Sequence, residues 1–117
     1  MPAGTYNILA EQGATFTRTI LYTDTAGDPI DLTGFTAEMH VRLKASTVST
    51  ITELSTGDST IVLGGAAGTI VMDLDATTME GLTAGKYVYD LELYNGAVVT
   101  RLIEGSFTIK AEVTRIP

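Results

Sequence analysis

The chain has no cysteine and no tryptophan among its 117 residues, and proline occurs only three times. Without cysteine, no disulfide, thiolate metal site or thiolate nucleophile can form, so burial alone must hold the fold together. The first twenty residues contain one basic residue, Arg18, and no long apolar run. That pattern predicts neither a signal peptide nor a membrane span. The length predicts a single domain over residues 1–117.

Positive charge is also scarce, with seven Lys and Arg residues against fourteen Asp and Glu and a formal net charge of −7. A nucleic-acid-binding protein needs a basic patch, which so few scattered basic residues do not form, so no nucleic-acid partner is expected. No Lys or Arg occurs between Lys44 and Lys86, a stretch that carries five carboxylates. The stretch indicates either a solvated acidic edge or a docking surface for a basic neighbour.

Helix-favouring runs are absent, whereas threonine is frequent and glycines separate short apolar stretches. This pattern is typical of a β-sandwich or barrel. The clearest strand is 35–43, in which Phe35, Ala37, Met39, Val41 and Leu43 alternate with polar residues. Further strands are expected at residues 5–10, 15–23, 60–63, 69–74, 86–94 and 97–104, with one helical turn at 76–82.

A C-terminal hairpin is predicted around Asn95 and Gly96, the dipeptide that best tolerates a two-residue type I′ turn. In that register Tyr94 opposes Ala97. Counting outward from the turn pairs Asp90 with Arg101, which places opposite charges across from one another.

The apolar residues assigned to the core face of the second hairpin strand occupy even positions up to Leu102 and odd positions from Phe107 onward. One extra residue must therefore be inserted between them to return Phe107 to the core face. We expect that β-bulge at Gly105. The register also predicts an outward apolar cluster in which Val88 lies across from Ile103. With Tyr94 and Val99 these two residues form the predicted interface, because a contiguous apolar patch rimmed by charge is typical of a binding surface. Coverage by another segment of the same chain is the alternative.

No pattern of residues indicates catalysis, a cofactor or a metal ion. His40, the only histidine, is expected on an outward strand face beside Glu38 and Arg42, without a nucleophile around it. The glycine-rich run 64–68 lacks the lysine of a phosphate-binding loop and is interpreted as a hairpin turn. Asp73 and Asp75 begin like a calcium loop, but the remaining ligands are missing. We therefore expect no enzyme, no cofactor and no metal site.

Four segments resemble small β-sandwich proteins of tailed phages, namely the tail-fibre collar proteins and the N-terminal domain of the baseplate upper protein. They are residues 11–16 (EQGATF), 28–37 (DPIDLTGFTA), 82–93 (LTAGKYVYDLEL) and 99–107 (VTRLIEGSF). The resemblance runs in order from about Tyr6 to Arg115. It implies an all-β, antiparallel, immunoglobulin-like sandwich of about seven to nine strands, without catalytic residues.

The resemblance also implies a role in the virion, assembled in the host cytoplasm. We expect a tail or baseplate connector or a fibre-attachment subunit that contacts other virion proteins and copies of itself. Because the chain stops at Pro117, a connector is expected rather than a long fibre. The alternatives are a capsid decoration protein and, from another class, a carbohydrate-binding module. The latter needs exposed aromatic residues, and Tyr94 is the only outward one expected in the hairpin.

Overall fold

The computed structural model describes residues 4–113. Over that range the chain forms nine strands, one α-helix and one 3₁₀ turn. The elements in chain order are β1 (Gly4–Thr5), β2 (Ile8–Glu11), β3 (Phe16–Leu21), β4 (Thr36–Arg42), β5 (Thr52–Ser55), β6 (Ile61–Leu63), η1 (Gly65–Ala67), β7 (Thr69–Leu74), α1 (Ala76–Glu80), β8 (Gly85–Asn95) and β9 (Val98–Lys110).

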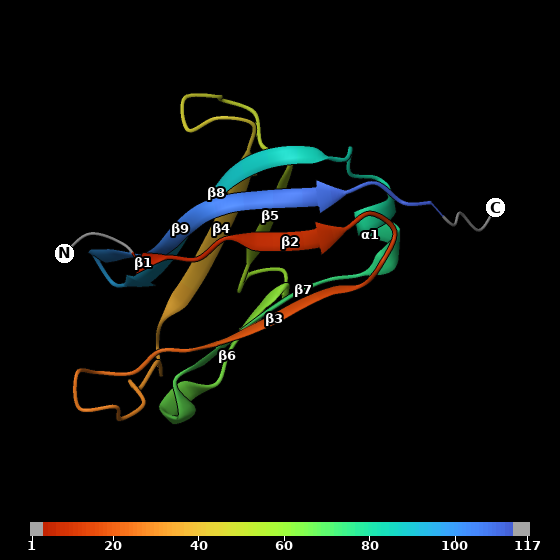
Figure 1. Ribbon diagram of the computed structural model, residues 1–117. Coiled ribbons are helices and arrows are strands. Elements are labelled where there is room, and N and C mark those ends of the chain that lie inside the picture. Colours follow the sequence, from red (N-terminus) through yellow and green to blue (C-terminus); the bar gives the residue numbers. More distant parts are fainter. Residues whose placement is uncertain (1–3, 114–117) are drawn as a thin grey trace.

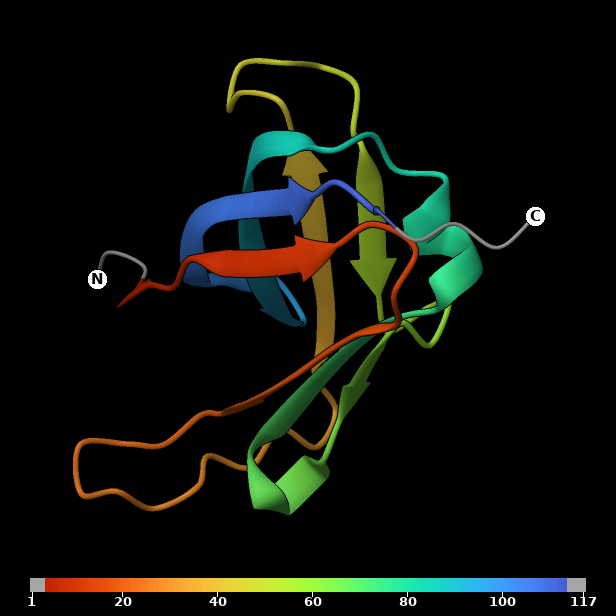
Figure 2. The same ribbon diagram turned by 45° about the vertical axis from the view of Figure 1, so that its right-hand side comes forward.

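Within residues 4–113 the strands form two sheets packed face to face (Figures 1 and 2). The large sheet has the order β1-β9-β8-β4-β5, with β2 also on β9, and the small sheet has the order β3-β7-β6. This order matches the immunoglobulin plan of a B-E-D sheet against a G-F-C-C′ sheet. The predicted all-β immunoglobulin-like sandwich is confirmed, although β1 and β2 pair with β9 in parallel.

A tyrosine corner lies at the start of β8, where the immunoglobulin plan places one. The Tyr87 hydroxyl donates a 2.7 Å hydrogen bond to the carbonyl of Thr83, four residues upstream. The Tyr87 side chain is itself buried, so the bond satisfies its one polar atom in the core. The corner fixes the path by which the chain leaves α1 and enters β8.

The core between the sheets is built from every second residue of each strand, as the sequence pattern of residues 35–43 predicts. Ala37, Met39 and Val41 are buried, whereas Leu43 at the end of that stretch is exposed. Phe107 lies at the centre of the core, with its ring centroid 5.4 Å from that of Phe16. In residues 4–113 no polar or charged residue is buried, so burial of apolar side chains supplies the cohesion that disulfides supply elsewhere.

The hairpin turn lies one residue further along than the sequence analysis predicts. Gly96 and Ala97 form the two-residue turn, and Asn95 pairs with Val98 as the last residue of β8. Gly96 has φ of +60° and takes the first central position, as in a type II′ turn, which needs a positive φ only there. The predicted pairing of Tyr94 with Ala97 is therefore wrong, and Tyr94 pairs with Val99.

The predicted bulge exists, but it lies at Leu102 and not at Gly105. Glu92 pairs with Arg101 and Leu91 pairs with Ile103, so Leu102 is the extra residue on β9. The inserted residue places Ile103, Phe107 and Ile109 on the core-facing side of β9. The predicted pairs of Asp90 with Arg101 and of Val88 with Ile103 are therefore wrong.

Gly105 is required for a different reason, the close approach of the N-terminal segment. Its φ is not in the left-handed region, but a Cβ there would lie 2.6 Å from the carbonyl oxygen of Tyr6 and 2.8 Å from Oδ1 of Asn7. Asn7 accepts a 3.0 Å hydrogen bond from the backbone N–H of Ser106. The segment between β1 and β2 is thus held tightly over Gly105. This close contact interrupts the predicted single strand 5–10, which forms two strands in the structure.

We expect Gly105→Ala to destabilise the fold by about 1–3 kcal/mol, because the added methyl overlaps backbone atoms that have little room to move. The control is Gly57→Ala, where the new methyl would meet only the Ser55 side chain at 3.6 Å. That change should alter stability by less than about 0.5 kcal/mol. Urea unfolding of both variants measures the difference, and equal stabilities would contradict the close approach.

Candidate protein-binding surface

The outer face of the large sheet carries a dense group of charged side chains from β4, β5, β8 and β9. We call this group the acidic face; its members are Glu38, His40, Arg42, Glu53, Asp90, Glu92, Arg101 and Glu104. The face is hollowed by a cavity of about 610 Å³, whose lining includes His40, Asp90 and Arg101. Three carboxylates, Asp90, Glu92 and Glu104, line the hollow together with two arginines, Arg42 and Arg101, so carboxylates are in excess.

Two pairs of like charges lie directly opposite one another on this face. Glu38 of β4 pairs with Glu92 of β8, and Asp90 of β8 pairs with Glu104 of β9. Like charges at opposed positions of neighbouring strands destabilise a sheet. The fold therefore holds these carboxylates together at a cost in stability.

Arg101, which lies on β9, compensates part of this repulsion between carboxylates. Its Nε lies 3.2 Å from Oδ2 of Asp90, and its Nη2 lies 3.4 Å from Oε2 of Glu92. Opposite charges at Asp90 and Arg101 thus meet as expected, but along a diagonal rather than across a direct pair. The Arg101 side chain is 54% exposed, and ion pairs at such exposure add little stability.

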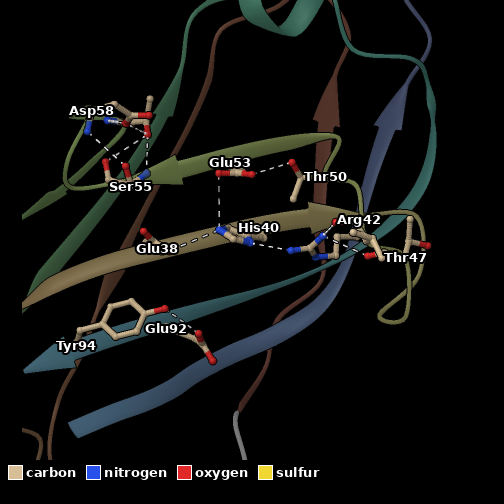
Figure 3. A network of polar contacts seen from close by, with 12 residues as sticks. Glu38, His40, Arg42, Thr47, Thr50, Glu53, Ser55, Asp58, Glu92 and Tyr94 are labelled. Carbon is tan, nitrogen blue, oxygen red and sulfur yellow. Dashed lines mark hydrogen bonds and ion pairs between the residues drawn. The ribbon is translucent and has the colours of Figure 1, made fainter. Parts of the chain in front are cut away.

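His40 lies between two carboxylates on the same face (Figure 3). Its Nε2 is 3.5 Å from Oε2 of Glu38 and 3.8 Å from Oε1 of Glu53. On the other side of the ring, Nη2 of Arg42 lies 3.0 Å from Nδ1. The guanidinium can only donate, so Nδ1 accepts and Nε2 carries a proton toward the carboxylates. This chain of contacts links β4 to β5.

Burial, together with the neighbouring carboxylates, raises the pKa of two residues on this face. Burial, with the neighbouring charges of Glu92 and Glu104, raises the pKa of Asp90 above its ordinary value of 3.8, against the opposing effects of Arg101 and His40. Burial also raises the pKa of Tyr94 to about 12, and its hydroxyl donates a 2.9 Å hydrogen bond to Oε1 of Glu92. Both shifts disfavour the negatively charged form of the side chain, on a face that already carries more carboxylates than arginines.

The structure divides the four residues of the predicted apolar interface between two locations. Tyr94 and Val99 are a direct cross-strand pair at the hairpin end of the outer face, where Val99 is 55% exposed. Val88 lies on the same face but opposite Ser106, with Asp90 and Glu92 between it and Tyr94.

Ile103 is not on the outer face, because the bulge at Leu102 turns it inward. It pairs with Leu91 and packs against the core. The expected contiguous patch across Val88 and Ile103 is therefore wrong. Lysine at Ile103 would disturb the core, whereas lysine at Val88 would remain on the surface.

The structure places the other sequence candidates away from the acidic face. The run 64–68 forms the turn η1 between β6 and β7, as predicted. Asp75 is the N-cap of α1 and accepts a 2.8 Å hydrogen bond from the N–H of Thr78, which lowers the pKa of its carboxyl. Asp73 is exposed on the outer face of β7.

Within residues 4–113 no three acidic or histidine side chains are arranged to hold a metal ion. In the same range no helix has the length and apolar character needed to cross a membrane.

Comparison with known proteins gives no functional assignment. No protein family and no curated protein matches the chain. Among solved structures, one from a photo-crosslinking study of multimeric cell-adhesive interactions of VGSC beta subunits overlaps 94% of this chain and 93% of its own. Its sequence identity is 11% and the TM-score is 0.40, too loose a match to transfer any property.

The raised pKa of Asp90 predicts how stability changes with pH. A carboxyl that is harder to ionise in the folded state binds its proton more tightly there, so its contribution to stability falls as pH rises above about 3.8. Asp90→Asn removes the charge and should stabilise the protein at pH 7. Because the group is partly exposed, the gain should not exceed about 1 kcal/mol.

Thermal unfolding of wild type and Asp90→Asn between pH 3 and pH 7 measures this effect. The two proteins should converge at the acidic end, where both side chains are neutral. Asp73→Asn, at an exposed carboxyl of the small sheet, is the control for loss of one negative charge. A variant that is less stable than wild type at pH 7 would show that the pair with Arg101 outweighs the repulsion.

Proposed function

We propose that this chain is a structural subunit of a tailed-phage virion, a tail or baseplate connector or fibre-attachment subunit, which binds a neighbouring virion protein through the acidic face. The resemblance of residues 11–16, 28–37, 82–93 and 99–107 to phage β-sandwich proteins supports the setting. The observation that carries the binding role is the opposition of like charges on the acidic face, where Glu38 lies opposite Glu92 beside the hollow and Asp90 lies opposite Glu104 within it.

The partner surface that fits this face is basic. Lysine or arginine side chains entering the hollow would neutralise carboxylates that the chain leaves partly uncompensated, and they would relieve the cross-strand repulsion on binding. Complementary charge also accelerates encounter and sets orientation. The contact should therefore weaken as ionic strength rises.

The apolar pair at the hairpin end of the same face complements this electrostatic contact. Tyr94 and Val99 lie side by side, and the Tyr94 ring is fixed by its bond to Glu92. Interfaces commonly combine aromatic and aliphatic contacts with charged surroundings. A rigid tyrosine that needs no reordering is a favourable contact residue, because little side-chain entropy is lost on binding.

The test is the double variant Glu38→Lys with Glu104→Lys, which converts both like-charge pairs into opposite-charge pairs. Each new pair should stabilise the sheet by about 0.2–1 kcal/mol, so the isolated protein should unfold at a higher temperature than wild type. Incorporation into particles should nevertheless be lost, because the face no longer attracts a basic partner. The variant is expressed in host cells infected by a phage that lacks this gene, and the protein bound to purified particles is then measured.

The matched control is Asp73→Lys with Glu80→Lys, which makes the same change of net charge away from the acidic face. This control should incorporate normally. Loss of incorporation in both double variants would attribute the effect to net charge and contradict a role for the face. Recovery of the protein in tail rather than head fractions distinguishes a connector from a capsid decoration protein.

A further inference from the structure

The outer edge of β3 is an open edge of the small sheet. The N–H of Tyr22 donates to the carbonyl of Gly68, which places the even-numbered residues of β3 in hydrogen-bonded pairs with β7. The backbone groups of Thr17, Thr19 and Leu21 consequently point away from the sheet. In Figure 2 no other strand runs beside this edge of β3 toward its C-terminal end.

Arg18 closes the first part of this edge. Its guanidinium donates to the carbonyl of Thr17 at 2.8 Å and to the carbonyl of Leu9 on β2 at 2.6 Å. It also lies 5.1 Å from the ring centroid of Phe16. The seam between β2 and β3 is thus sealed by one side chain, and the open part of the edge is reduced to Thr19 and Leu21.

The neighbouring edges show how open backbone groups are usually satisfied in this fold. On β2, the carbonyl of Leu9 binds Arg18 and that of Glu11 accepts from the N–H of Ala14. On β5, the N–H of Ser55 is capped at 2.8 Å by the Thr60 hydroxyl. Within residues 4–113 no comparable hydrogen bond reaches the backbone of Thr19 or Leu21. Unpaired strand edges are templates for another strand.

Charge identifies the strand that fits this edge. Residues 12–23 contain no Asp or Glu, and their one charged residue is Arg18, in a chain of net charge −7. A second copy approaching through most other surfaces would bring carboxylates against carboxylates. At this edge it would not, so the edge is electrostatically compatible with the chain itself.

We propose that two copies of this chain associate by antiparallel pairing of their β3 edges about a twofold axis. Thr19 of each copy pairs with Leu21 of the other, and Ile20 faces its own counterpart at the axis. The pairing is isologous and joins the two small sheets into one continuous sheet. Leu21, which is 56% exposed in the single chain, becomes covered. The acidic faces belong to the other sheet and stay free.

Sedimentation of the wild-type protein over a wide range of concentration tests the proposal, and a monomer–dimer equilibrium is expected. Leu21→Lys places a charge on the edge and should abolish the dimer without changing thermal unfolding at the lowest concentration. Thr19→Pro removes an N–H that only the second copy uses, and an edge strand tolerates proline there. This variant should also be monomeric, and it tests the same edge if Leu21→Lys disturbs folding.

Val62→Lys is the matched control. Val62 is 50% exposed on β6, at the opposite edge of the same small sheet, and this variant should dimerise like wild type. A wild type that stays monomeric throughout would overturn the proposal. So would a dimer that survives Leu21→Lys, or one that Val62→Lys also abolishes, since either result places the contact elsewhere. These outcomes are independent of binding through the acidic face.

Discussion

The choice of which residues of β9 face the core is the constraint on which the rest of the structure depends. This strand pairs with β8 on one side and with β1 and β2 on the other, and it places Phe107 against Phe16 and Tyr89 in the core. A chain without cysteine relies on that apolar contact for cohesion. One extra residue at Leu102 makes the alternation fit, because without it the apolar residues beyond the bulge would face solvent.

The same constraint determines the composition of the outer face. Once the bulge sets the register, Glu104 must lie opposite Asp90, and the pairing of β4 with β8 brings Glu38 opposite Glu92. A surface selected for stability alone would alternate the signs of these charges. The two sheets therefore differ in character. The large sheet carries uncompensated negative charge suited to a basic partner, whereas the small sheet has an edge that is free of carboxylates and suited to a second copy.

The sequence was sufficient to predict the fold class and most strands, because alternation such as that of Ala37, Met39 and Val41 reports burial directly. It was insufficient for the hairpin register. Asn95-Gly96 fits two turn types that differ in which residues occupy the centre, and the parity change after Leu102 can be satisfied by a bulge at several positions. Ile103 was misplaced for that reason. The acidic face escaped prediction because its charges are scattered over four strands, and only the pairing brings them together.

The most direct measurement of the central claim is carbodiimide labelling of carboxylates in the free protein and in assembled particles, read out by mass spectrometry. If the large sheet binds a neighbour, Glu38, Glu53, Asp90 and Glu104 should lose reactivity on assembly. Asp58 and Asp73, which are exposed outside the acidic face, should remain reactive. Equal labelling of the acidic face in both states, with protection of Asp58 or Asp73 instead, would contradict the assignment of this surface as the binding site.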